Sequence, residues 1–188
     1  MKKILIVSNS IWNVENFRRS LINKFLDLNY KIDIIVPFDK KYLNTIAHKN
    51  IKIIYINFKS KSYFIFLDFL FIYKLSRYIK KNNPHYVLSF TVKPNLISGF
   101  LSRFYNYKSI CNVTGLGTLF LRGNFIKTLT LLLYKICFKK VNHIFFHNLN
   151  DKKIFIKNFV VNDYNSSTIP GSGVDLNYFY YDKKKYFK

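Results

Sequence analysis

The chain has 188 residues, of which 49% are hydrophobic and 19% aromatic, and this composition excludes an intrinsically disordered protein. The length is sufficient for one domain with a sizeable core. A formal net charge of +22 favours anionic partners, such as a membrane surface, a phosphorylated ligand or a nucleic acid. A codon bias toward AT-rich triplets explains the excess of lysine equally well, because alanine and glutamate are almost absent.

The N-terminus and the cysteines point to a cytoplasmic protein. Two lysines precede the first apolar run, but that run ends at Ser8, so it favours a first strand over a signal peptide. Cys111 and Cys137 are too few and too unpatterned for a disulfide framework or a zinc site.

Residues 63–79 form the most hydrophobic stretch. It is close to the minimum length for crossing a bilayer, but Asp68 lies in its middle and Lys74 and Arg77 lie near its end. We therefore expect a buried helix, or a helix that rests in a membrane interface, rather than a membrane span.

Short apolar runs alternate with helical patterns along the whole chain. Residues 3–8 predict a strand, and the next segment predicts an amphipathic helix, with apolar residues three and four apart at Val14, Phe17, Leu21, Phe25 and Leu28. Further strands are expected at 31–37, 51–57, 85–90, 109–113, 143–148 and 166–170. Further helices are expected at 41–48, 63–79, 93–105, 124–141 and 151–160, the last with Asn150 or Asp151 as its cap.

This alternation predicts an α/β fold with a Rossmann-like, doubly wound parallel sheet. The strands are apolar throughout, as expected when helices cover both faces of a parallel sheet. Ligands of such sheets bind beyond the carboxyl ends of the strands, so the loops after the strands are the candidate sites.

The loop after the first strand is rich in small polar residues. It has no glycine, which disfavours a dinucleotide-binding fingerprint. The side chains of Ser8, Asn9 and Ser10 precede a helix and are suited to face an anion, although an ordinary capping turn is an equally good interpretation.

Two later loops have features of phosphate sites. In "TVKPN" (91–95), Lys93 comes just before a helix N-terminus, whose dipole adds to its charge. In "NVTGLGTLF" (112–120), Gly115 and Gly117 offer bare backbone amides for an oxyanion or a diphosphate, and Arg122 is close in sequence. Each pattern is also common in loops without a ligand.

The sequence lacks the residue patterns required for metal binding, two-carboxylate hydrolysis and P-loop phosphoryl transfer. His143 and His147 are four apart on an expected strand, which is a poor spacing for a metal pair, so no metal site and no cofactor are expected. Glu15 is the single glutamate, which argues against a two-carboxylate hydrolase, and no P-loop motif is present.

Taken in chain order, five segments resemble motifs of family 4 glycosyltransferases. They are "NSIWNVENFRRSLI", "SFTVKPNLISGFLSR", "NVTGLGTLF", "IFFHNLNDKKIF" and "IPGSGVDLNYF". The likeness extends from Lys3 to Phe179 and is closest to bacterial enzymes that build lipid-linked O-antigen, capsule or N-glycan precursors. It departs from the family pattern after the first strand, where relatives often have a glycine.

The resemblance implies the N-terminal half of a GT-B enzyme, in which two Rossmann-like domains face each other across a cleft. In the family, this half takes the acceptor, often a polyprenyl-diphosphate sugar at the membrane. The other half holds a nucleotide sugar, of UDP type, through a motif with two glutamates, and the sugar is transferred with retention. By resemblance, the acceptor or its diphosphate would meet Lys93, Asn95, Thr114, Gly115, Gly117 and Arg122, and the loop of Ser8, Asn9 and Ser10 would line the cleft. The resemblance assigns no catalytic residue.

The last motif corresponds to the loop that leads into the interdomain linker of the family. It contains Gly171, Ser172, Gly173, Val174 and Asp175. We therefore expect one N-terminal domain at 1–180, a linker start or tail at 181–188, and no donor-binding domain. The chain alone would then be an incomplete enzyme, from either a truncated gene or a split enzyme.

Two alternatives without catalysis remain at this stage. The charge and the 63–79 segment suit a basic peripheral membrane module. They also suit a nucleic-acid-binding module, but no recognised nucleic-acid-binding motif is present, and no specific nucleic acid partner is expected. The sequence leaves the sugar, the acceptor and the linkage open.

Overall fold

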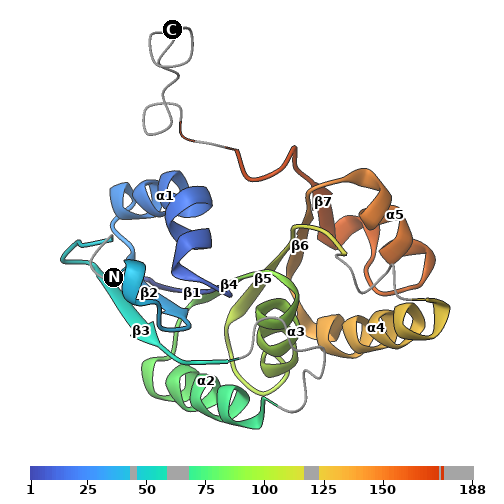
Figure 1. The fold of residues 1–188 in the computed structure, drawn as a ribbon, viewed down its shortest axis with the longest axis horizontal. Coiled ribbons are helices and arrows are strands. Elements are labelled where there is room, and N and C mark those ends of the chain that lie inside the picture. Colours follow the sequence, from blue (N-terminus) through green and yellow to red (C-terminus); the bar gives the residue numbers. More distant parts are fainter. Residues whose placement is uncertain (43–45, 59–67, 117–122, 174, 176–188) are drawn as a thin grey trace, which may run out of the picture.

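The computed structural model describes residues 1–42, 46–58, 68–116, 123–173 and 175. Within them the chain forms one seven-stranded sheet, in the order β3-β2-β1-β4-β5-β6-β7, and every pair of neighbouring strands is parallel (Figure 1). The strands are β1 (Lys3–Val7), β2 (Lys31–Val36), β3 (Ile51–Tyr55), β4 (Tyr86–Phe90), β5 (Lys108–Val113), β6 (His143–Phe146) and β7 (Ser166–Thr168). The α-helices are α1 (Ile11–Asp27), α2 (Phe69–Asn82), α3 (Val92–Leu101), α4 (Asn124–Cys137) and α5 (Leu149–Lys157).

The strand order reverses between β1 and β4, and this confirms the predicted doubly wound fold. β1 is the pivot, because it pairs with β2 on one side and with β4 on the other. Its residues Ile4 to Val7 are completely buried, as expected for a central strand of a parallel sheet that is covered on both faces.

Two hydrophobic clusters lie on the two faces of the sheet. One contains Ile11, Val14 and Ile22 of α1, and the other contains apolar residues of α2, α3, α4 and α5. Figure 1 shows α1 and α2 on opposite sides of the sheet. Alternate residues of each strand serve the two clusters, so that Ile6 packs under α1 while Leu5 packs under the other helices.

The predicted apolar face of α1 is buried only in part, since Val14 is buried and Phe25 packs against the same cluster. Leu21 and Leu28 are exposed, whereas Glu15 and Arg18 are buried together with the apolar residues of this helix. Apolar side chains lie on more than one face of α1, so the hydrophobic spacing did not define a single orientation. The consequence is that two charged side chains point toward the sheet.

Several element boundaries differ from the prediction. The expected helix at 41–48 is a short 3₁₀ helix at Lys40–Tyr42 in the described residues. The expected helix at 63–79 is observed as α2 from Phe69, and residues 63–67 lie outside the described residues. The cap of α5 is Asn148, whose side chain accepts a hydrogen bond from the Asp151 N–H, and not Asn150 or Asp151.

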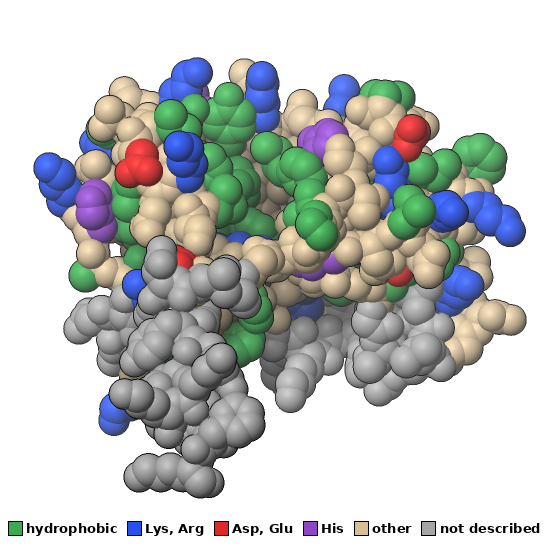
Figure 2. Space-filling view, turned by 90° about the horizontal axis from the view of Figure 1, so that it is seen from above, with side chains coloured by type: hydrophobic (Ala, Val, Ile, Leu, Met, Phe, Trp, Pro, Cys, Tyr) green, Lys and Arg blue, Asp and Glu red, His purple; other side chains and the backbone are tan. Residues whose placement is uncertain are grey.

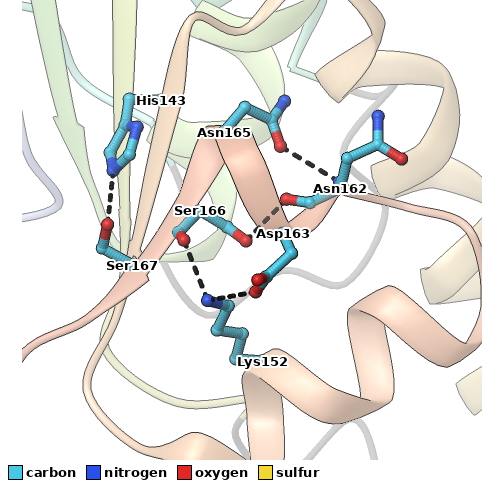
Figure 3. A network of polar contacts seen from close by, with 7 residues as sticks. All are labelled: His143, Lys152, Asn162, Asp163, Asn165, Ser166 and Ser167. Carbon is cyan, nitrogen blue, oxygen red and sulfur yellow. Dashed lines mark hydrogen bonds and ion pairs between the residues drawn. The ribbon is translucent and has the colours of Figure 1, made fainter.

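A polar network fastens the edge strand β7 to its neighbours (Figure 3). The Lys152 ammonium on α5 donates to the Ser166 carbonyl oxygen at 2.9 Å and forms an ion pair with Asp163 at 2.7 Å. On the adjoining strand, the His143 imidazole and the Ser167 hydroxyl are hydrogen-bonded at 3.0 Å. These contacts hold a three-residue strand in place, and so they position the loop that follows it.

Candidate functional site

The candidate site lies at the edge of the sheet where the strands end. In a doubly wound sheet the loops diverge at the point where the strand order reverses, which here is between β1 and β4. Side chains from α1 and from the loops after β5, β6 and β7 line cavities at this edge. Figure 2 looks onto the molecule from the α1 side and shows Lys and Arg side chains around the rim of this face, with hydrophobic side chains toward its middle.

The loop after β1 forms an ordinary helix cap. The Ser10 side chain accepts a hydrogen bond from the Asn13 N–H at 3.1 Å, which satisfies one of the free donors at the start of α1. Ser8 is completely buried, and its hydroxyl lies 3.4 Å from the Asn13 side-chain oxygen. The Asn9 side-chain oxygen is buried and has no hydrogen-bond partner among the described residues.

The turn from β4 into α3 is strained and fully packed. Thr91 has φ 74° and ψ 165°, a region that residues other than glycine rarely adopt. Lys93 is buried and forms an ion pair with Asp68, the residue before α2. Asn95 is also buried, and its amide donates to the Asn112 carbonyl oxygen at 2.8 Å. The structure therefore holds Lys93 and Asn95 in contacts within the protein.

The predicted diphosphate cradle after β5 is described only in part. Thr114 and Gly115 are half-buried at the end of β5, while Gly117 and Arg122 lie outside the described residues. Thr114 lines the same cavity as residues of α1 and of the loop after β7, so the structure brings it together with the loop at 170–173.

The loop after β7 depends on its two glycines. Gly171 and Gly173 have φ values of 77° and 70°, in the left-handed region that L-residues with a Cβ rarely adopt. Between them, the Ser172 hydroxyl accepts a hydrogen bond from the Arg18 guanidinium at 2.9 Å. Asp175 lines a neighbouring cavity, and Val174 lies outside the described residues. The loop thus closes over α1.

Arg18 is the most unusual side chain at this edge. It is 4% exposed, and its guanidinium lies over the Phe90 ring at 4.1 Å from the ring centre. Its Nε and one terminal nitrogen, Nη2, have no hydrogen-bond partner among the described residues. Burial lowers the pKa of Arg18 to about 10, because a guanidinium loses hydration when it leaves water. The group remains protonated and charged at neutral pH.

His147 follows β6 and lies beside Arg18. Its backbone N–H donates to the Val113 carbonyl oxygen at 3.2 Å, while its buried Nε2 has no partner among the described residues. Burial lowers the pKa of His147, and the positive charge of Arg18 lowers it further. His143, its predicted neighbour on one strand, lies at the opposite end of β6 and bonds Ser167.

Two cavities meet at Arg18. One, of about 470 Å³, lies between α1 and the ends of β4 to β7 and includes Glu15, whose carboxylate forms an ion pair with Arg19. The other, of about 490 Å³, is lined by Arg18 and His147 together with Asn13, Thr114 and the loop at 170–173. The second cavity combines two side chains that each carry nitrogens without a hydrogen-bond partner among the described residues with neutral polar groups, which is a suitable lining for an anion.

Sequence reasoning missed Arg18, Glu15 and His147. A signal for the first two was present, since Glu15 and Arg18 recur at helical spacing with Ile11, Val14 and Ile22. Charges on an apolar face of a helix are functional candidates when they are buried. No comparable signal marked His147.

Two further features bear on the class of protein. Within the described ranges, no group of three or more His, Cys, Asp or Glu residues is placed to hold a metal ion. The helices of those ranges are all too short or too polar to cross a membrane.

Comparisons with known proteins agree on the fold. Sucrose-phosphate synthase from Thermosynechococcus elongatus matches 94% of this chain with a TM-score of 0.69 at 11% identity, over 49% of its own length. The Anabaena HepE protein, solved in complex with UDP and glucose, matches 98% of this chain with a TM-score of 0.69 at 11% identity, over 48% of its length. A glycosyltransferase from Rickettsia africae matches 98% with a TM-score of 0.59 at 20% identity, over 47% of its length.

The chain thus spans about half the length of these structures. A search of curated proteins found no match. The sequence model described as "Glycosyl transferase 4-like" matches residues 3–148, which is most of the chain and includes the loops after β1, β4, β5 and β6. The chain belongs to the glycosyl transferase 4-like family, and its fold is that of the N-terminal half of a GT-B glycosyltransferase.

Proposed function

We propose that this chain is the acceptor-binding domain of a glycosyltransferase that receives a sugar from a nucleotide sugar. The main support for this proposal is the family match over residues 3–148. The cavities at the carboxyl edge of the sheet provide space for a ligand. The HepE structure, which is a complex with UDP and glucose, supports a nucleotide-sugar donor. Matched structures are about twice as long, so we propose that transfer needs a donor-binding domain in addition to these 188 residues.

The proposed acceptor is a lipid-linked sugar used to assemble surface polysaccharide or glycan precursors. Its diphosphate would lie near Thr114 and Gly115, at the end of β5, with Gly117 and Arg122 as further proposed contacts. Lys93 and Asn95 would take part only if the contacts of Lys93 with Asp68 and of Asn95 with Asn112 are shared with the acceptor or opened.

A lipid-linked acceptor implies contact with a membrane surface, and α4 offers a suitable face. Phe125, Leu129, Leu132 and Ile136 are exposed at spacings of four, three and four, so they form one apolar stripe along this helix. Exposed apolar stripes combined with basic residues favour anionic lipid interfaces. We propose that this stripe rests on the membrane.

Vesicle sedimentation tests the membrane contact. Leu129→Glu combined with Leu132→Glu should release the chain from anionic vesicles, whereas charge reversal at Lys74 and Arg77 on α2 should weaken binding less. Equal binding of the α4 variant and the unaltered chain would contradict the assignment to α4.

Sugar transfer tests the function itself. The chain is incubated with radiolabelled UDP-sugars and polyprenyl-diphosphate sugars, alone and after co-expression with candidate donor-binding domains encoded near its gene. We expect transfer only in the presence of a donor-binding domain. Efficient transfer by the 188 residues alone would contradict the requirement for a second domain, and no transfer with any donor-binding domain would contradict the function.

A further inference from the structure

The positive charge of Arg18 lacks a counter-charge within the described part of the chain. The ion pairs there involve Lys3, Arg19, Lys93 and Lys152, and none of them includes Arg18. The groups that the guanidinium meets are neutral: it donates to the Ser172 hydroxyl at 2.9 Å and to the Phe17 carbonyl oxygen at 3.4 Å, and it lies over the Phe90 ring. Buried charges are normally paired, because an unpaired one loses hydration without compensation. The missing partner is therefore an anion.

His147 adds a further nitrogen without a hydrogen-bond partner among the described residues to the same cavity. Its Nε2 is buried without a hydrogen-bond partner among the described residues, and it lines the 490 Å³ cavity together with Arg18. An anion between the two side chains would accept from both. Burial lowers the pKa of this imidazole, and the charge of Arg18 lowers it further; an anion would offset the part that comes from Arg18.

The remaining lining suits an anion with several oxygen atoms. Thr114 contributes a hydroxyl, Asn13 contributes an amide, and the loop at Gly171–Gly173 contributes backbone. A planar guanidinium binds the oxygens of a phosphate through parallel hydrogen bonds. The cavity volume exceeds that of one phosphate and leaves room for a diphosphate and the start of an attached group.

We propose that the cavity between α1 and the Gly171–Gly173 loop binds a phosphate-class oxyanion through Arg18 and His147. Arg18 neutralises the anion, His147 donates from Nε2, and Ser172 holds the guanidinium in place until the anion arrives. That the anion is the diphosphate of a sugar substrate rests on the proposed function, whereas the anion site itself does not.

Isothermal titration with pyrophosphate at constant ionic strength tests this proposal on the full chain. Arg18→Gln should weaken binding by about tenfold or more, the loss expected for one charge-assisted hydrogen bond to a buried group. Arg103→Gln is the matched control, because Arg103 is exposed and its replacement lowers the net charge equally. A highly basic chain attracts any polyanion, so the difference between the two variants is the informative quantity.

His147→Gln is the second variant, at a half-buried position, and it should also weaken pyrophosphate binding. It keeps the proposal testable if Arg18→Gln does not fold, as judged by circular dichroism. No pyrophosphate binding, or binding that both His147→Gln and Arg18→Gln leave equal to the Arg103→Gln control, would overturn the proposal.

Titrations with UDP and with farnesyl diphosphate identify the source of the phosphate. Tighter Arg18-dependent binding of farnesyl diphosphate than of pyrophosphate would assign the site to a lipid-linked acceptor, and tighter binding of UDP would assign it to the donor. Either result supports the anion site. Because these titrations need no sugar transfer, failure of the site and failure of the proposed function would be distinguishable.

Discussion

Two buried cations lie at the same edge of the sheet, and they differ in the groups that compensate their charge. Lys93, in the turn after β4, is paired with the carboxylate of Asp68. Arg18, on α1, is equally buried but meets the Ser172 hydroxyl and the Phe90 ring instead of a carboxylate. The first arrangement is complete within the protein, while the second leaves two guanidinium nitrogens without partners in the described residues.

A position beside a helix N-terminus therefore does not by itself make a cation available to a ligand. Lys93 has that position, yet its charge is already neutralised by Asp68. Arg18 lies within a helix, where sequence reasoning expected no site, and is the cation whose charge needs an external partner. Three substitutions test this contrast.

The largest effect is expected from removal of the partner of Lys93. Asp68→Ala removes the carboxylate that forms an ion pair with the buried Lys93 ammonium and should lower the free energy of unfolding by about 3 kcal/mol. Urea denaturation measures this change. The control is Asp163→Ala, which removes the exposed partner of Lys152 and should cost less than about 1 kcal/mol. Equal losses for the two variants would show that Lys93 does not depend on Asp68.

A smaller effect is expected in the loop that closes over Arg18. Gly171→Ala introduces a Cβ at a φ of 77° and should destabilise the chain by about 1–2 kcal/mol, although no atom lies within 4 Å of the new Cβ. Gly171→Asn should cost less, because asparagine tolerates this conformation better. Thermal unfolding compares the two variants. Equal melting temperatures for Gly171→Ala and Gly171→Asn would show that residue 171 does not keep the observed left-handed conformation.

The smallest effect is expected at Arg18 itself. Replacement of a buried charge by an apolar side chain of similar length is often neutral or stabilising, so Arg18→Met should change the free energy of unfolding by no more than about 1 kcal/mol. Lys93→Met is the matched comparison and should cost more, because it leaves the Asp68 carboxylate without its partner. A loss above about 2 kcal/mol for Arg18→Met would mean that Arg18 has a structural role.

The fold followed from the sequence because its signals are strong and repeated. Short, mostly apolar runs such as those at 3–7 and 31–36 favour central strands of a parallel sheet, and helical segments alternate with them. Boundaries were less certain because caps depend on local hydrogen bonds. Asn148 and Asn150 are equally good capping residues by type, and only the structure shows that Asn148 accepts from Asp151.

The candidate site was predicted less well, for two physical reasons. Apolar residues on several faces of α1 concealed its orientation, so Arg18 was assigned to no site. Contacts between distant segments, such as those of Arg18 with Ser172 and of Lys93 with Asp68, have no trace in local spacing. Thr114 and the loop at 171–173 were identified in advance, because strand ends and glycines mark such loops in sequence.

We propose that Arg18, rather than Lys93, meets an anion at this edge. The most direct test is the rise in melting temperature that pyrophosphate causes in the unaltered chain, in Arg18→Gln and in Lys93→Gln, at constant ionic strength. We predict that Arg18→Gln loses this rise and that Lys93→Gln keeps it. The opposite result, with the rise in melting temperature lost in Lys93→Gln and kept in Arg18→Gln, would place the anion at the turn after β4 and contradict a site at Arg18.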